Sequence, residues 1–292
     1  MRTFVFTCLL LLGMTTFAQD ANFHIYLCLG QSNMEGNAKV EEQDTVAVDS
    51  RFQVLAAVDC PNLGRTKGNW YKAVPPLARC YTGLTPGDYF GRAMVANLPS
   101  NVRVGIINVA VGGCRIELFD KDNYQSYVET SPDWLKNMVK EYGGNPYARL
   151  VEMAKLAQKD GVIKGILLHQ GESNTNDKDW PLKVKGVYDN LLNDLGLSAA
   201  NVPLLAGEVV HADQNGVCAS MNTIIDSLPQ VIPTAHVISS AGCPAAFDNL
   251  HFTAEGYRML GARYVAKMLS ILGYGDWNFK RKIKSKISNS LG

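Results

Sequence analysis

The sequence predicts an α/β fold, a three-layer sandwich in which helices cover both faces of a central parallel sheet of about five strands. Short apolar runs alternate with amphipathic stretches along the 292 residues, and this alternation is typical of parallel sheets. Most of the runs are nearly continuous and rich in Val, Ile or Leu, as in strands buried on both faces. With 47% hydrophobic and 19% charged residues, the composition excludes a disordered chain.

The expected elements follow from these patterns in chain order. The strands are His24–Leu29, Val102–Val109, Val162–His169, Pro203–Val209 and His236–Ser239. The helices are Asp88–Leu98, Pro132–Glu141, Pro146–Lys159, Asp179–Leu195, Met221–Leu228 and Ala254–Leu272, the last with Thr253 as its N-cap. The stretch Asn37–Pro86 is long, irregular and rich in Gly, Pro and aromatic residues. We expect a functional loop region or an inserted hairpin there.

The two ends of the chain differ from its body. In residues 1–18, Arg2 precedes a short apolar run that ends in small residues, which predicts a cleavable signal peptide and a secreted or periplasmic protein. Residues 19–275 then form the folded domain, and residues 276–292 form a basic tail. The net charge of +1 gives no case for nucleic acid as a partner, nor for a membrane after signal cleavage.

Six cysteines remain once the signal peptide is removed, and export permits disulfides. Cys60 and Cys80 flank a loop-like stretch, and Cys218 and Cys243 also lie in connections. We therefore expect the pairs Cys60–Cys80 and Cys218–Cys243. Cys28 lies within an apolar strand and is expected to be a buried thiol.

In a parallel sheet, ligands bind beyond the carboxyl ends of the strands. Small and polar residues are concentrated just after four of the expected strands and before the last helix. The five segments are residues 30–36, 110–115, 170–174, 210–213 and 247–252. Their composition is hard to explain by packing alone, so they are the candidate site.

Three residues in these segments suggest nucleophilic catalysis. Ser32 follows a strand and opens a helical turn, where it is either a helix cap or a nucleophile. Asp248 and His251 are three residues apart, a spacing that lets a carboxylate orient one imidazole nitrogen and leave the other for the serine. The alternative for this pair is a surface turn followed by a cap.

Neighbouring residues offer hydrogen-bond donors for an oxyanion. Gly112-Gly113 allows the backbone to approach a ligand closely, although an ordinary strand-to-helix turn would have the same sequence. The Gln170 amide and the Ser32 N–H would complete an oxyanion hole. Glu172 either braces its loop or bonds near the histidine.

The blocks GQSNMEG, VAVGGCR, HQGESN and DNLHFT occur in this order. Together they resemble the SGNH (GDSL-like) hydrolase superfamily, and within it the branch of carbohydrate esterase family 6 and the sialate O-acetylesterases. The resemblance covers about residues 22–272 and implies the flavodoxin-like form of the predicted sandwich. It implies Ser32 as nucleophile, His251 as base, Asp248 as the orienting acid, and an oxyanion hole of the Ser32 N–H, Gly113 (or Gly112) and Gln170. Cys114 stands where we expect serine or threonine in relatives.

The resemblance implies an exported acetylesterase that needs no metal or cofactor. Its substrate is expected to be an acetylated plant polysaccharide or oligosaccharide, xylan first, with O-acetylated sialic acid as the alternative. Arg115 would meet a sialate carboxylate, or else pair with Glu117 or Asp120.

Three other classes of protein compete with this interpretation. An α/β-hydrolase needs G-x-S-x-G, but Met34 occupies the last position. A metal-dependent deacetylase could use His169, Glu172, His211 and Asp213, although no H-E-x-x-H is present. A non-catalytic carbohydrate-binding protein could stack sugars on aromatic side chains. The candidates are Trp70, Tyr71, Tyr81, Tyr89 and Trp180.

Overall fold

The computed structural model describes residues 19–274 and has a seven-stranded central sheet. The strands are β1 (Asp20–Gly30), β2 (Phe52–Leu55), β3 (Trp70–Lys72), β4 (Arg103–Ala110), β5 (Gly161–His169), β6 (Leu204–Gly207) and β7 (Ala235–Ile238). Their order is β3-β2-β4-β1-β5-β6-β7. All neighbours are parallel except β2 and β3. The predicted α/β sandwich is confirmed, with two more strands than expected.

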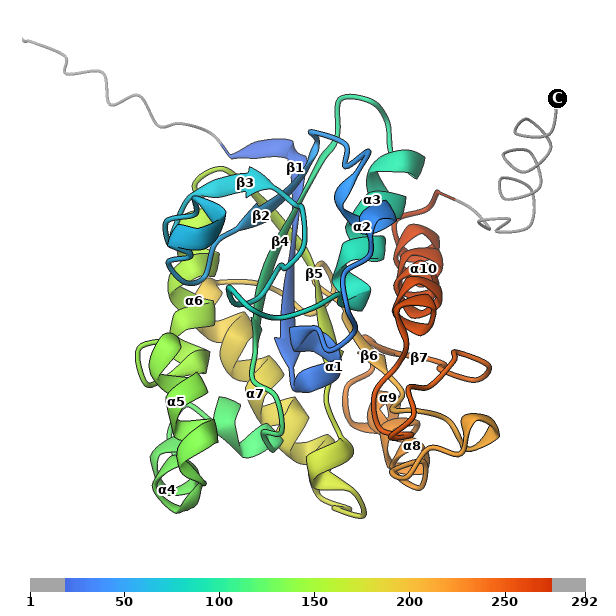
Figure 1. Ribbon diagram of the computed structural model, residues 1–292. Helices are drawn as coiled ribbons and strands as arrows, with labels where there is room; N and C mark the ends of the chain where they lie inside the picture. The colour runs from blue at the N-terminus through green and yellow to red at the C-terminus, as the bar shows by residue number, and fades with distance from the viewer. Residues whose placement is uncertain (1–18, 275–292) are drawn as a thin grey trace, which may run out of the picture.

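Helices cover both faces of this sheet (Figure 1). They are α1 (Ser32–Glu35), α2 (Glu42–Thr45), α3 (Pro86–Asn97), α4 (Tyr124–Thr130), α5 (Asp133–Glu141), α6 (Pro146–Ala157), α7 (Trp180–Leu195), α8 (Met221–Ile225), α9 (Leu228–Val231) and α10 (Ala254–Ile271). The expected helix 221–228 is thus divided between α8 and α9. Thr253 caps α10 as predicted, because its Oγ1 accepts a hydrogen bond from the Gly256 N–H.

The sheet separates two hydrophobic clusters, and β1 supplies both through alternate side chains. Ile25, Leu27 and Leu29 belong to the cluster under α5, α6 and α7. Tyr26 and Cys28 belong to the cluster under α3 and α10. Burial on both faces explains the continuous apolar runs of the sequence.

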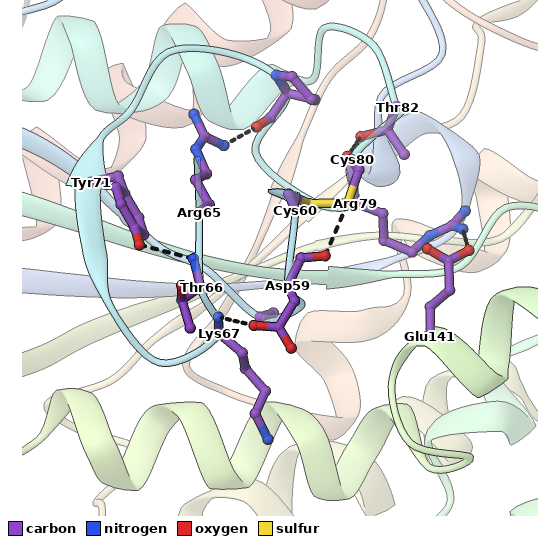
Figure 2. The surroundings of a disulfide bond; sticks show 12 residues. Asp59, Cys60, Arg65, Thr66, Lys67, Tyr71, Arg79, Cys80, Thr82 and Glu141 are labelled. Atoms are coloured by element: carbon purple, nitrogen blue, oxygen red, sulfur yellow. Dashed lines mark hydrogen bonds and ion pairs between the residues drawn. A yellow bond between two sulfur atoms is a disulfide. The ribbon is translucent and has the colours of Figure 1, made fainter. Parts of the chain in front are cut away.

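The irregular stretch Asn37–Pro86 holds the two additional strands. β2 joins the sheet beside β4, and β3 pairs antiparallel with β2 at the edge. The predicted Cys60–Cys80 disulfide is confirmed, with the two Cα atoms 5.2 Å apart. Figure 2 shows this disulfide beside Arg79 and Thr82. The segment is therefore an inserted hairpin with a cross-linked loop.

The predicted Cys218–Cys243 disulfide is wrong, since both residues are free thiols. Cys218 packs against the cluster of the α6 and α7 face, whereas Cys243 lies in the cluster under α3 and α10. The sheet thus keeps the two sulfur atoms apart. Cys28 is a buried free thiol, as expected.

The predicted signal peptide, residues 1–18, and the predicted basic tail, residues 276–292, lie outside the described residues. Between residues 19 and 274, none of the helices combines the length and apolarity needed to cross a bilayer.

Candidate active site

The carboxyl ends of β1, β4 and β5 meet at one level of the sheet. Gly30 is in register with Ala110 on one side and His169 on the other. A side chain on Gly30 would collide with the His169 carbonyl oxygen, 2.0 Å from an ideal Cβ. Glycine there lets the chain leave the sheet sharply, so that Gln31 and the short helix α1 follow directly.

Ser32, His251 and Asp248 come together at this edge. His251 Nε2 lies 2.9 Å from Ser32 Oγ. His251 Nδ1 lies 2.7 Å from Asp248 Oδ2. Asp248 Oδ1 accepts the backbone N–H groups of Leu250 and His251, each at 3.0 Å. These contacts form a serine–histidine–carboxylate relay in which the carboxylate fixes the orientation of the imidazole.

The Asp248 carboxylate is stabilised in its charged form. Partial burial acts to raise its pKa, but the hydrogen bond with the His251 side chain and those from two backbone N–H groups outweigh burial. The pKa of Asp248 is therefore held below its ordinary value. A charged Asp248 keeps the proton of His251 on Nδ1, which leaves the Nε2 lone pair facing Ser32.

Asn33 connects the serine turn to the histidine loop, and sequence reasoning missed it. Its Nδ2 donates to the Leu250 carbonyl at 3.1 Å and to the Glu172 carboxylate. Its Oδ1 accepts from the Phe252 N–H at 3.4 Å and from the Tyr257 hydroxyl at 2.7 Å. Asn33 is fully buried, so these bonds fix the loop on both sides of His251. The available signal was an amide on each side of the serine in GQSN.

Gln31 is the other amide, and it positions the loop after β5. Its Oε1 accepts from Gln170 Nε2 at 3.1 Å and from the Ser173 N–H at 3.2 Å. Gln170 Nε2 also donates to Asn174 Oδ1 at 2.7 Å and to the Cys114 carbonyl at 3.3 Å.

Gln170 is thus next to the site, but its donors already have protein acceptors. Trp180 donates to its Oε1, and only 1% of Gln170 is exposed. These are the contacts of a residue that braces two loops. The oxyanion role of Gln170 stays a prediction.

The glycine pair after β4 packs against the serine turn. An ideal Cβ on Gly112 would lie 2.8 Å from Glu35 Oε2 and 3.7 Å from Ser32 Cβ. Gly113 has a φ of 71°, and an ideal Cβ there would lie 2.6 Å from the Trp134 ring. Both positions require glycine. Cys114 Sγ lies 3.6 Å from the Gly30 carbonyl oxygen, so its thiol packs beneath the turn.

Glu172 and His169 form a buried pair behind the relay. Glu172 Oε1 bonds Asn33 and lies 3.9 Å from His169 Nε2. Burial raises the pKa of Glu172, and its hydrogen bonds offset only part of this effect. Burial lowers the pKa of His169 to about 3, so that ring is neutral. Of the two predicted roles of Glu172, its contacts favour the bracing one.

Other predicted residues lie further from the relay. Arg115 pairs with Glu117 at 3.2 Å and with Asp177 at 3.4 Å, so the expected Asp120 is not its partner. His211 pairs with Asp213 at 3.3 Å and begins a short 3₁₀ turn. His169 with Glu172, and His211 with Asp213, are separate pairs. Among the described residues, no three His, Cys, Asp or Glu side chains are grouped as ligands for a metal ion.

Most of the aromatic residues proposed for sugar stacking have packing roles. Trp180 is fully buried and Trp70 packs against Phe23. The Tyr89 hydroxyl donates to Asp44 and the Tyr71 hydroxyl accepts from a backbone N–H. Tyr81 differs, because 89% of its surface is exposed.

Comparison with known proteins matches this chain to a family. Residues 22–270 match the family described as carbohydrate esterase, sialic acid-specific acetylesterase. A "probable carbohydrate esterase" of Arabidopsis thaliana is 25% identical in an alignment 264 positions long, which covers 84% of this chain and 90% of that protein.

Solved structures share the fold at low sequence identity. An Arabidopsis thaliana protein matches with a TM-score of 0.65 at 20% identity, over 86% of this chain and 99% of that one. NanS matches with a TM-score of 0.62 at 15% identity, over 88% and 99%. A carbohydrate acetylesterase from Xanthomonas citri matches with a TM-score of 0.58 at 17% identity, over 85% of this chain and 56% of that one. With a family match across nearly all the described residues, the chain belongs to the sialic acid-specific acetylesterase family of carbohydrate esterases.

Proposed function

We propose that this protein removes O-acetyl groups from a sugar by a serine mechanism. The observation that carries the proposal is the pair of contacts at His251, with Ser32 Oγ at 2.9 Å and Asp248 Oδ2 at 2.7 Å. A serine hydroxyl needs an adjacent base to attack a carbonyl, and the base needs a fixed orientation. The family supplies the acetyl ester as substrate.

In the first half-reaction, Ser32 Oγ attacks the acetyl carbonyl carbon while His251 Nε2 takes its proton. The carbonyl oxygen becomes an oxyanion, and N–H groups of the Ser32 turn and of Gly112-Gly113 are the proposed donors. The tetrahedral intermediate collapses, the C–O bond to the sugar breaks, and His251 returns the proton to the sugar oxygen.

In the second half-reaction, water attacks the acetyl–Ser32 ester. His251 takes a proton from the water, the second tetrahedral intermediate forms, and Ser32 Oγ leaves with the proton that His251 gives back. The products are acetate and the free enzyme. Asp248 stays ionised throughout and stabilises the positively charged imidazole.

For the sugar we propose O-acetylated sialic acid, because the family description names this class. Acetylated xylan remains the second candidate. Placement of the chain among the SGNH hydrolases and near carbohydrate esterase family 6 belongs to the same proposal and is supported by the four sequence blocks. Export is supported by residues 1–18 alone.

A substrate panel with two variants tests the proposal. The wild type should release acetate from O-acetylated sialic acid faster than from acetylated xylan, and a fluorophosphonate should label Ser32. Ser32→Ala and His251→Ala should each lower turnover of an aryl acetate by about 10⁶-fold, with an unchanged circular dichroism spectrum. Turnover by Ser32→Ala at the wild-type rate would overturn the mechanism. Faster release from xylan would overturn the substrate assignment, and an unlabelled, inactive wild type would favour a non-catalytic carbohydrate-binding protein.

A further inference from the structure

A groove of about 680 Å³ opens beside the serine turn. Its lining comes from the segment after α1, the cross-linked loop after β3, and helix α5. The lining residues are Glu35, Gly36, Asn37, Ala38, Lys39, Val40, Arg79, Tyr81, Thr82, Gly83, Met138 and Glu141. None of the residues predicted for the relay or the oxyanion hole belongs to it.

Glu35 lies between the groove and the serine turn. One Glu35 carboxylate oxygen bonds Arg79 inside the groove. The other lies 2.8 Å from an ideal Cβ on Gly112, and Ser32 Cβ lies 3.7 Å from the same point. Glu35 therefore spans the distance between the groove and the neighbourhood of Ser32.

The walls of the groove are preformed. The Gly83 N–H donates to the Gly36 carbonyl at 2.7 Å, and the Leu84 N–H donates to the Ala38 carbonyl at 2.8 Å. The Cys60–Cys80 disulfide anchors the same loop one residue before Tyr81. Figure 2 shows the loop next to Glu141, with which Arg79 pairs. A rigid groove reduces the entropy cost of binding a ligand.

Two exposed aromatic side chains border this groove and the site. Tyr81 lines the groove and is 89% exposed. Trp134, 52% exposed, lies against Gly113 and is four residues before Met138 on the same face of α5. Exposed rings that need no partner for folding are suited to stacking on the apolar face of a sugar.

The charges of the groove leave one cation without a partner. Arg79 is neutralised by Glu35 and Glu141. Lys39 lines the groove, is exposed, and has no ion pair among residues 19–274. Arg115, the residue predicted for a carboxylate, is occupied by Glu117 and Asp177. A carboxylate that enters this groove therefore meets Lys39.

We propose that the groove binds the sugar ring that carries the acetyl group, with Tyr81 stacked on the ring and Lys39 paired with a carboxylate of that sugar. This inference rests on the proposed function for its ligand, an O-acetylated acidic sugar. It assigns sugar recognition to the inserted segment and leaves bond cleavage to Ser32 and His251.

The stacking contact is tested with Tyr81→Ala and a matched control, Tyr274→Ala, which changes an exposed tyrosine beyond the far end of α10. The kcat/KM for O-acetylated sialic acid, divided by that for an aryl acetate, should fall about tenfold in Tyr81→Ala. Tyr81→Trp should restore it, and Tyr274→Ala should leave it at the wild-type value. An equal ratio in Tyr81→Ala and Tyr274→Ala would overturn the stacking role.

The carboxylate contact is tested with Lys39→Met and the exposed control Lys159→Met. On O-acetylated sialic acid, Lys39→Met should lose about fivefold in kcat/KM. On the carboxyl methyl ester of the same sugar, it should match the wild type. Equal losses on the acid and on its methyl ester would overturn the role of Lys39, as would a preference of the wild type for acetylated xylo-oligosaccharides.

Binding can be separated from catalysis in the Ser32→Ala background. Calorimetry with O-acetylated sialic acid should give a dissociation constant that rises about tenfold when Tyr81→Ala is added. An unchanged constant would overturn the subsite while aryl acetate turnover by the wild type still supports the esterase. Conversely, a wild type inactive on every ester would overturn the proposed function whatever the calorimetry shows.

Discussion

Two histidine–aspartate pairs stand in segments that follow strands of the same sheet, and only one of them reaches a serine. In the first pair, His251 Nδ1 faces a carboxylate oxygen of Asp248 at 2.7 Å and Nε2 faces Ser32. In the second, His211 Nδ1 accepts the backbone N–H of Asp213 at 3.3 Å. His211 Nδ1 also lies 3.3 Å from a carboxylate oxygen of Asp213, but within residues 19–274 its Nε2 has no hydrogen bond to a serine hydroxyl.

The difference lies in what each aspartate does. Asp248 accepts two backbone N–H groups with one oxygen and presents the other to the ring. Asp213 instead accepts the Gly242 N–H at 2.8 Å and so connects its turn to the segment after β7. A histidine close to an acid is therefore common to both pairs, and the contact of Nε2 with a serine hydroxyl distinguishes the first pair.

The substitution with the largest expected effect, Asp248→Asn, disrupts the first pair alone. It should lower the kcat for an aryl acetate about 10⁴-fold, because an amide cannot hold the proton of His251 on Nδ1. Asp213→Asn is the matched control and should keep wild-type kcat. Stopped-flow or continuous assays measure the kcat of both variants. A similar kcat for the two would show that the pairs do not differ in function.

A second test moves the serine while leaving both pairs intact. Gly112→Ala adds a methyl group 2.8 Å from Glu35 Oε2, and Glu35 can move away only by disturbing its ion pair with Arg79. The displaced serine turn should cost about 10²-fold in kcat. Gly186→Ala, where an added Cβ meets nothing within 4 Å, should leave kcat unchanged. Wild-type activity in Gly112→Ala would mean that this close approach does not position Ser32.

The support behind the first pair is tested at Glu172. Glu172→Ala leaves one N–H of the buried Asn33 amide without an acceptor, while the bond to the Leu250 carbonyl remains. The unfolding free energy should therefore fall by about 2 kcal/mol and kcat by about tenfold. Glu172→Gln keeps an oxygen for Asn33 and should restore most of both. Urea unfolding and aryl acetate turnover provide the two measurements. If Glu172→Gln were as inactive as Glu172→Ala, the carboxylate would have a direct chemical role.

The smallest effect on activity is expected at His169, a third histidine beside an acid. Its pKa is lowered to about 3 in the fold, while an unfolded histidine titrates near 6.5. Between these pH values the unfolded chain binds one more proton, so the free energy of unfolding falls as the pH falls, by about 1.4 kcal/mol per pH unit. His169→Leu should flatten this dependence. The same slope of unfolding free energy against pH in the wild type and in His169→Leu would contradict the lowered pKa of His169.

The sequence was sufficient to predict the sandwich and the residues of the relay. Strands buried on both faces have a distinctive apolar pattern. Ser32 lies directly after a strand, where ligands bind, whereas Asp248 and His251 lie before the last helix and were assigned from their spacing and the family resemblance. The short strands β2 and β3 lie in an irregular stretch between the serine turn and α3. Four-residue and three-residue strands at a sheet edge do not form long apolar runs, and so they were not predicted individually.

Contacts between distant segments could not be predicted. Cys218 and Cys243 both lie in connections, and only the fold shows that they contact opposite faces of the sheet. Asn33 bonds groups near residues 172 and 251, and nothing in its local sequence specifies those partners. The bracing contacts of Gln170 could not be predicted either, since its three acceptors come from three different segments.

Ser32 and His251 are 219 positions apart in the chain, and α10 begins only three residues after His251. Because α10 packs on α3, which follows the serine by about fifty residues, the histidine loop takes its place only when the C-terminal helix closes against the N-terminal half. A growing or truncated polypeptide therefore lacks the Ser32–His251 contact, however well its first strands have folded. Esterase turnover would then report complete synthesis, and two fragments divided before residue 251 would gain it only by reassociation.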